Sequence, residues 1–150
     1  MLGEPMPTPD KLRAKIWDLC FPDSPLDPQS TLQHLYENAA LRHKSALKEL
    51  LIASLTTDAD TLPDWYKTFF AMPWHKIYTL NIDDVELATV RKHSLPRKIV
   101  AVSATKPTFD NRESDKNCLR VIHLNGTLDD LVDNVTFSMS QYAERLYRSA

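Results

Sequence analysis

Glycine is nearly absent from this sequence, and its scarcity restricts the folds and sites that the chain can build. Gly3 and Gly126 are the two glycines among 150 residues, whereas average usage of about 7% would give roughly ten. An α/β domain that binds a nucleotide ordinarily uses a glycine-rich turn, because glycine lets the backbone approach a pyrophosphate closely. No glycine lies between residues 4 and 125, so we expect no phosphate loop of that type there.

The composition is that of one soluble, globular domain. A length of 150 residues suits a single core, and 43% hydrophobic with 25% charged residues argues against disorder and against a coiled coil. The formal charge is −2 and the basic clusters alternate with acidic stretches, so direct nucleic-acid binding is not predicted. The sequence has no run of 18 apolar residues and no signal-peptide pattern at its start. We therefore expect no membrane association and a cytoplasmic location.

The two cysteines do not form a metal-binding pattern. Cys20 and Cys118 lie far apart, and neither has a second cysteine or a histidine at ligand spacing. A zinc ribbon brings its ligands as two close pairs, so it is excluded and no zinc is expected. Buried thiols are the expectation for a cytosolic protein, with a disulfide left open on arithmetic alone.

The first half, about residues 9–72, has the patterns of helices. Thr8 followed by Pro9 predicts a helix over about 9–20, and Ser30 with Gln33 has the capping-box spacing of a second helix start. Apolar residues then recur at three- and four-residue steps as far as residue 55, which indicates either one bent helix or two stacked ones. A further helix from about residue 63 carries aromatic residues that we assign to the core.

From about residue 74 to the end, the patterns are those of an α/β core. Alternating strands and helices predict a Rossmann-like parallel sheet that carries the N-terminal helical region. A helix is expected from about residue 85 to 91, and a last helix is expected from Ser138 and Gln141 through Tyr147. The expected strands are 77–79, 98–102, 119–124 and 135–137.

Two loops follow strands directly and so lie where α/β sheets place their reactive groups. Asn81 and Asp83 follow the first strand, and we expect both side chains to point into a cleft above the sheet. Asn and Asp are also the commonest helix caps, so a purely capping role stays open for both. At the end of the third strand, His123 and Asn125 share a face. Gly126 marks either a simple turn or a close ligand approach, and His123 is interpreted as structural.

The segments around Asn81 and Asn125 occur in an order found in one known family. The first runs from Trp74 to Asp84 and contains Thr-Leu-Asn-Ile-Asp, and the second runs from Val121 to Leu128 and contains Leu-Asn-Gly. Together with a third segment, from Phe137 to Tyr142, they resemble the sirtuin-like NAD-hydrolase domains of bacterial antiphage defence. The similarity covers roughly residues 64–146.

The resemblance implies a substrate, a set of site residues and partners. NAD would be the substrate, and Asn81, Asp83 and Asn125 would occupy the catalytic positions. Asn81 would position the nicotinamide ribose or the attacking water, while Thr79, Ile82 and Gly126 would contact the dinucleotide. The lack of paired cysteines fits the zinc-free defence branch of the family. Other protein chains of a defence complex are the expected partners beside NAD.

Three departures from the family pattern shape the functional prediction. The family has a histidine base directly before its glycine, whereas this chain has Asn125, and an amide is not basic near neutral pH. His123 lies about 7 Å away along the strand, which is too far to replace that base. The family's glycine-rich loop precedes the first helix, and this chain starts too late to hold it, although residues 2–7 fit the tail of that element. The family also continues into a turn that helps hold the adenine ribose, whereas this chain stops at Ala150. We therefore expect a fragment of a larger sirtuin-like domain.

Several functions remain open at this point. The leading prediction is an NAD+ glycohydrolase domain that depletes NAD in defence and is inactive as given, because Asn125 replaces the base. The first alternative is a non-catalytic sirtuin-like module that binds NAD or ADP-ribose, or that assembles a larger complex. Asn125 would be natural in that case, and an engineered change from histidine is a further possibility. The last alternative is a small interaction module without a nucleotide site, in which residues 81–83 only cap a helix.

Overall fold

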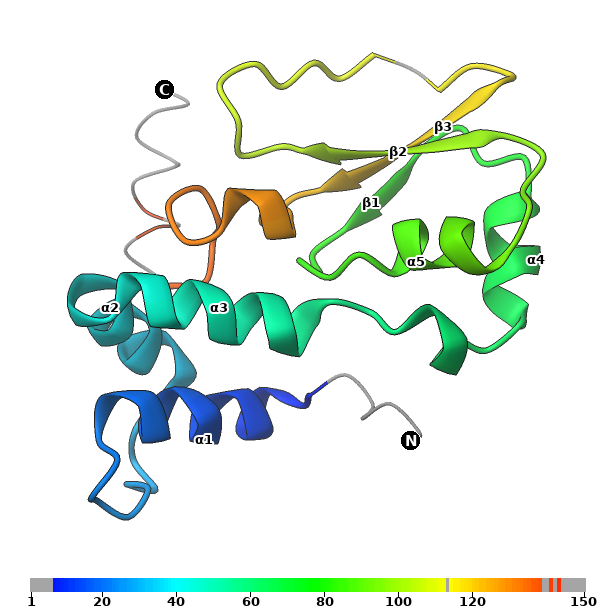
Figure 1. The fold of residues 1–150 in the computed structure, drawn as a ribbon. Helices are drawn as coiled ribbons and strands as arrows, with labels where there is room; N and C mark the ends of the chain where they lie inside the picture. The colour runs from blue at the N-terminus through cyan, green and yellow to red at the C-terminus, as the bar shows by residue number, and fades with distance from the viewer. Residues whose placement is uncertain (1–6, 113, 139–140, 142, 144–150) are drawn as a thin grey trace.

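The structure is a computed structural model that describes residues 7–112, 114–138, 141 and 143. Helices occupy the first half of the chain and a parallel sheet lies in the second half, in the predicted order (Figure 1). The chain is therefore a mixed α/β protein with a small parallel sheet, which is compatible with part of a Rossmann-like fold.

Three helices form the N-terminal region: α1 (Pro9–Cys20), α2 (Leu32–Arg42) and α3 (Lys44–Leu55). Thr8 caps α1 as expected, because its hydroxyl accepts the Lys11 amide at 3.3 Å. The backbone leaves the helical conformation at His43, so the second and third helices are separate. The predicted cap at Ser30 is wrong by one residue. Thr31 caps α2, while the Ser30 hydroxyl donates to the Asp27 carbonyl and closes a turn.

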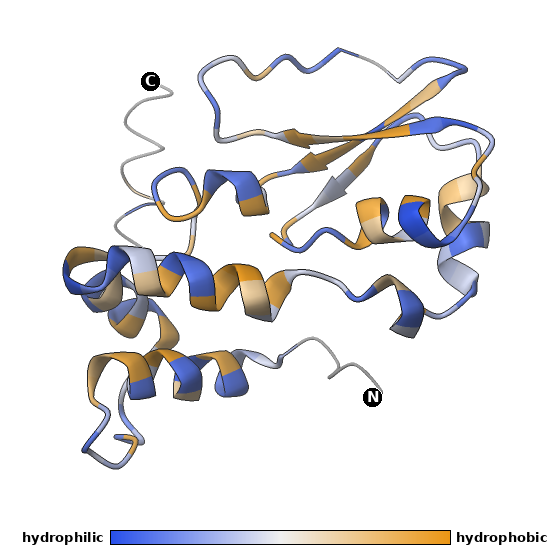
Figure 2. Cartoon of the chain, viewed as in Figure 1, coloured by the Kyte–Doolittle hydropathy of each residue, from blue (hydrophilic) through white to orange (hydrophobic). Residues whose placement is uncertain are grey.

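A short 3-10 helix, η1 (Ala59–Thr61), and α4 (Trp65–Ala71) lead to the sheet. Its strands are β1 (Ile77–Thr79), β2 (Lys98–Ser103) and β3 (Cys118–His123), in the order β1-β3-β2, and both pairings are parallel. Helix α5 (Val85–Lys92) connects β1 to β2 and contacts β2, whereas residues 104–117 connect β2 to β3 without a helix. Figure 2 shows hydrophobic residues along β2 and β3 and a mostly hydrophilic 104–117 connection.

The predicted strand at 135–137 is wrong. This segment follows a second 3-10 helix, η2 (Leu128–Asp130), and has no strand pairing. The Thr136 amide donates to the Asn125 carbonyl at 2.9 Å, and Phe137 stacks on Tyr36 with ring centroids 4.8 Å apart. Val135 is buried and Phe137 is half-buried because both pack on the helical region, so the segment follows a β-type pattern without adding to the sheet.

The last predicted helix lies mostly outside the described residues, and so do Tyr142 and Tyr147. Its expected capping box is present at the edge of the described part. The Gln141 amide donates to the Ser138 hydroxyl at 3.3 Å, and the Gln141 side-chain oxygen accepts the Ser138 amide at 3.1 Å. The sequence pattern at this helix start therefore corresponds to a real local structure.

Two hydrophobic clusters stabilise the fold. The larger one joins the three N-terminal helices to Leu131, Val132 and Val135 and also contains Ile82 from the loop after β1. The smaller one packs Phe70 of α4 against Ile99, Leu119 and Val121 of the sheet. Ile82 thus attaches the loop after β1 to the helical region rather than to the sheet.

Two further features of the described residues concern membrane helices and the cysteines. No helix within the described ranges is long and apolar enough to cross a membrane. Cys20 and Cys118 are both free and half-buried, so the disulfide alternative is wrong. Burial raises the pKa of the Cys20 thiol, and Arg42 partly offsets this effect.

Candidate functional site

The loops after β1 and β3 meet at one edge of the sheet. Thr79 and His123 are paired in register at the ends of their strands, so residues 80–84 and 124–127 leave the sheet side by side. This is the carboxyl edge, where α/β sheets bind their ligands. The sequence-based placement of both loops is confirmed in this respect.

The side chains of His123, the last residue of β3, and of Asn125 hold the backbone of the loop after β1. The Asn125 Nδ2 group donates to the Leu80 carbonyl at 2.9 Å, and the His123 Nδ1 atom lies 2.8 Å from the Asn81 carbonyl. The Asn81 amide donates to the Thr79 hydroxyl at 3.0 Å. Two consecutive peptide groups are therefore fixed, while the Asn81 side-chain amide is exposed and has no hydrogen-bond partner among the described residues.

His123 also forms a buried pair with Glu86 of α5. The His123 Nε2 atom lies 3.0 Å from the Glu86 carboxylate, and the two side chains are 1% and 4% exposed. Both ring nitrogens face oxygen acceptors, so a proton must lie between the imidazole and the carboxylate. Burial alone would lower the pKa of His123, but the hydrogen bond and charge of Glu86 outweigh burial and raise it. His123 is structural, as the sequence interpretation stated.

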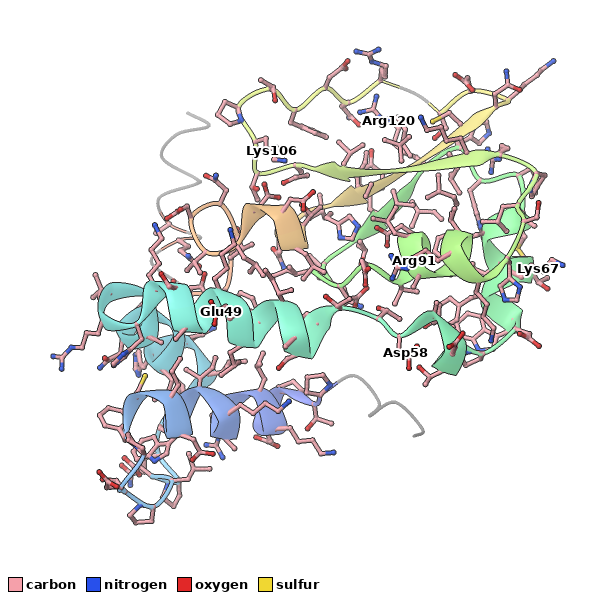
Figure 3. All side chains as sticks on the ribbon, in the orientation of Figure 1. Glu49, Asp58, Lys67, Arg91, Lys106 and Arg120 are labelled. Atoms are coloured by element: carbon pink, nitrogen blue, oxygen red, sulfur yellow. The ribbon has the colours of Figure 1, made fainter. Side chains whose placement is uncertain are left out.

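Asp83 and Asp84 have different environments although they are adjacent. One Asp83 oxygen accepts the Val85 amide at 3.3 Å, which closes a local turn just before α5. Burial raises the pKa of the Asp83 carboxyl, and the charges of Glu86 and Asp84 add to this effect. Asp84 instead accepts the Thr57 amide at 2.7 Å and pairs at 2.9 Å with Arg91, which Figure 3 labels. Asp84 therefore ties α5 to the segment after α3, whereas the second oxygen of Asp83 keeps no partner among the described residues.

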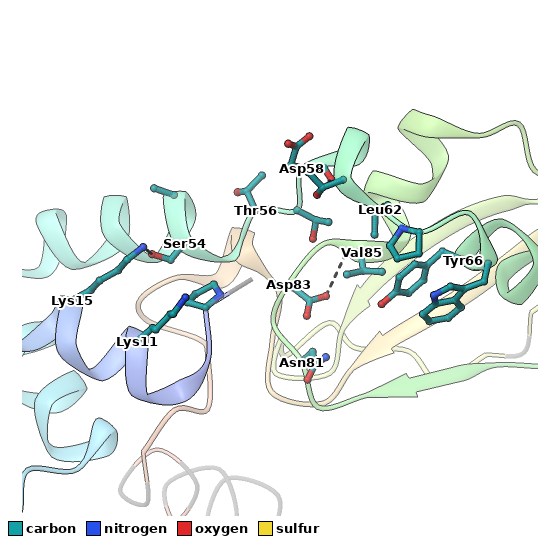
Figure 4. Close-up of a pocket in the computed structure, with 16 residues that line it drawn as sticks. Lys11, Lys15, Ser54, Thr56, Asp58, Leu62, Tyr66, Asn81, Asp83 and Val85 are labelled. Carbon is teal, nitrogen blue, oxygen red and sulfur yellow. Dashed lines mark hydrogen bonds between the residues drawn. The ribbon is translucent and has the colours of Figure 1, made fainter. Parts of the chain in front are cut away.

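Two cavities adjoin this loop. The larger, of about 500 Å³, lies between α1, the segment after α3, α4 and the loop after β1 (Figure 4). We call it the lysine cavity, after Lys11 and Lys15. The second, of about 420 Å³, is lined by Leu80, Asn125 and Phe137 among others, and we call it the Asn125 cavity. Asn81 and Asp83 line both. Volumes of this size are typical of small-molecule sites.

The predicted site residues occupy three kinds of position. Asn81, Asp83 and Asn125 lie together at the cavities, and Ile82 lines the Asn125 cavity while its side chain joins the larger core. Thr79 and Gly126 line neither of these two cavities. Thr79 accepts the Asn81 amide, and Gly126 forms the turn that follows β3. These two residues shape the loops.

Three residues of this region were missed by the sequence interpretation: Asp84, Glu86 and Arg91. A signal for Glu86 exists, because Ile82, Glu86 and Thr89 are spaced by four and three residues and all are buried. A glutamate on the buried face of a helix needs a partner. Nothing local indicates that this partner is His123, which lies 37 residues further along the chain.

Gly126 allows a close approach between two backbone segments. Its φ is 95°, and a Cβ atom at this position would lie 2.9 Å from the Asn134 carbonyl oxygen and 3.2 Å from Val135. We expect Gly126→Ala to lower the free energy of unfolding by about 1–3 kcal/mol, because the strained φ and the contact add. Urea denaturation would measure the loss, with Ser45→Ala on the exposed face of α3 as control. Equal stability of the two variants would contradict this geometry.

Within the described ranges, no group of three or more histidine, cysteine or acidic side chains is arranged to hold a metal ion. Comparison of the chain with protein-family models, with curated proteins and with solved structures finds no match.

Proposed function

We propose that this chain is part of a sirtuin-like NAD+ glycohydrolase domain and that its carboxyl edge receives the nicotinamide-ribose end of NAD. One observation carries the proposal: Asn81, Asp83 and Asn125, from loops more than 40 residues apart, line adjoining cavities at one edge of a parallel sheet. The resemblance of these segments to the sirtuin-like defence domains supports it. The bacterial cytoplasm as location and other chains of a defence complex as partners belong to the same proposal.

The free polar groups suit this ligand. The Asn81 amide has both a donor and an acceptor for ribose hydroxyls or for a water molecule. Asp83 has one uncommitted oxygen beside the cavities, and its carboxylate would attract the positively charged nicotinamide ring. Ile82 fixes the loop because it is packed in the larger core. These residues bind and orient the ligand.

Cleavage also needs a proton acceptor. Water attacks C1′ of the ribose, the C1′–N1 bond breaks with its electron pair going to nicotinamide, and the attacking water gives up one proton. Asn125 cannot take that proton, since an amide is not basic near neutral pH. His123 is buried, and its two nitrogens already face Asn81 and Glu86. We therefore propose that the chain as given has little or no hydrolase activity.

A second candidate is a non-catalytic module that binds NAD or ADP-ribose. The observation that favours it is the hydrogen bond from Asn125 to the Leu80 carbonyl, which gives the asparagine a structural role. In this case Asn125 is a functional residue in its own right. The two candidates share the binding site and differ only in the reaction.

Asp83→Asn tests the binding site, and the two expected effects have opposite signs. Burial raises the folded pKa of Asp83 above its unfolded value, so its ionised form costs stability above about pH 4. The variant should unfold at a higher temperature than the parent at pH 7, and this gain should shrink as the pH falls toward 4. Its affinity for NAD+ should fall by about tenfold or more, because the carboxylate that attracts the positively charged nicotinamide ring is lost, whereas ADP-ribose, which lacks this ring, should bind no more weakly.

The controls for Asp83→Asn separate a binding role from capping. Asp23→Asn removes the same charge from an exposed loop and should change neither quantity. Asn81→Ala should leave the melting temperature unchanged, since its side chain caps nothing, and should weaken ADP-ribose binding measured by calorimetry. If Asp83→Asn binds NAD+ and Asn81→Ala binds ADP-ribose as the parent does, or if the parent binds neither ligand, the interaction-module alternative is favoured instead.

A further inference from the structure

The wall of the lysine cavity formed by α1 carries two positive charges that have no acidic partner among the described residues. Lys11 and Lys15 lie one turn apart and extend from α1 on the side that faces the loop after β1 (Figure 4). The Lys15 ammonium donates to the Ser54 hydroxyl at 3.4 Å and has no acidic partner within the described ranges. The Lys11 ammonium makes no hydrogen bond or ion pair with the described residues. Like charges one turn apart repel each other, so an anion between them would relieve this repulsion.

The opposite wall of the lysine cavity carries acidic and amide side chains, and its far end carries aromatic ones. Asn81 and Asp83 line it from the loop after β1, and Asp58 lines it from the segment before η1. At the far end Trp65 stacks on Tyr66 with ring centroids 3.8 Å apart, and Trp65 is 56% exposed. The cavity therefore has a cationic wall, an acidic and amide wall, and an aromatic end.

We propose that Lys11 and Lys15 form a diphosphate-binding subsite of this chain. This inference rests on the proposed function, because it places the nicotinamide end of the same ligand at Asn81 and Asp83. NAD+ carries a positive ring at one end and a negative diphosphate in its middle. That charge distribution matches a carboxylate at Asp83 and ammonium groups on α1.

The chemistry of lysine suits this task. A lysine ammonium is a compact charge with three donors on a flexible stem, and it binds phosphate without bringing the backbone close. A glycine turn instead needs its own amides near the ligand. Asp58 and Asp83 would repel a diphosphate from the other walls, so the anion is directed to α1.

The experiment measures the binding of three probes by calorimetry: ADP-ribose, ADP and adenosine. The variants are Lys11→Gln, Lys15→Gln and the double change, and Lys48→Gln is the matched control, because Lys48 is an exposed lysine of α3 outside both cavities. At low salt we expect each single change to weaken ADP-ribose and ADP binding by about tenfold, and the double change to weaken it further. Lys48→Gln should have no effect, and adenosine, which has no phosphate, should bind all variants equally. Raising the salt concentration should weaken the parent more than the double variant.

The outcomes separate this subsite from the proposed function. If the lysine variants bind ADP-ribose and ADP as the parent does while Asp83→Asn loses affinity for NAD+, the lysine subsite is overturned and the proposed function stands. If the lysine variants lose affinity for ADP while Asn81→Ala keeps its affinity for ADP-ribose and Asp83→Asn keeps its affinity for NAD+, the phosphate subsite stands and the nicotinamide site is wrong. Equal weakening of adenosine binding, or no binding of any phosphate probe at millimolar concentration, would also overturn the subsite.

Discussion

Replacing Asn125 with histidine is expected to raise the rate of NAD cleavage by about 10²–10⁴-fold, the range of a well-placed proton acceptor. The Asn125 side chain donates to the Leu80 carbonyl at 2.9 Å and lines the Asn125 cavity. A histidine there can donate from Nδ1 to the same carbonyl, which leaves Nε2 as an acceptor for the proton of the attacking water. The hydrogen bond that shapes the loop is kept while a base is gained.

The pH dependence identifies the new base. An ordinary histidine has a pKa of about 6.5, so the gain should be small at pH 5.5 and should grow to a plateau near pH 8. Nicotinamide release by both forms of the full gene product, across this range, is the measurement. Asn117→His is the matched control, because Asn117 is exposed just before β3, at the opposite edge of the sheet. Equal rates for the Asn125→His form and the parent, with intact folding and ADP-ribose binding, would leave only the binding-module function.

Glu86→Ala is expected to lower the free energy of unfolding by about 3–5 kcal/mol, which is the largest stability effect we predict. The change leaves the Nε2 side of His123 without its partner in the core, where both side chains are almost fully buried. Glu86→Gln should cost much less, since its amide can donate to Nε2 of a neutral imidazole that still donates to the Asn81 carbonyl. Glu49→Ala, on the exposed face of α3 (Figure 3), is the control.

The pH dependence of this pair has a definite sign. The pKa of His123 is raised in the folded protein because the interaction with Glu86 outweighs burial. The stability that its proton contributes is therefore fully present below about pH 6.5, the ordinary value, and is lost as the pH rises through the folded pKa. Urea denaturation at several pH values should show this loss in the parent but not in Glu86→Gln. The same slope in both proteins would contradict a shared proton.

Much of the local structure could be predicted because its causes are local. The Thr8-Pro9 start of α1, the three-residue strand β1 and the capping box at Ser138 each depend on residues within a few positions of one another. The wrong strand prediction has a tertiary cause. Residues 135–137 have a β-type apolar pattern, but burial against Tyr36 satisfies that pattern as well as a sheet would.

For the candidate site as well, neighbouring residues determine some features and tertiary packing determines the others. The sequence by itself determined that Asn81, Asp83 and Asn125 follow strands, since strand pattern and loop position are encoded in neighbouring residues. Only the tertiary structure decided that Glu86 meets His123, that Asn125 donates to Leu80, and that two lysines of α1 face Asp83 across a cavity. A residue pattern shows which face of an element is buried. It does not determine which distant residue that face meets, because this depends on strand register and on how the helices pack against the sheet.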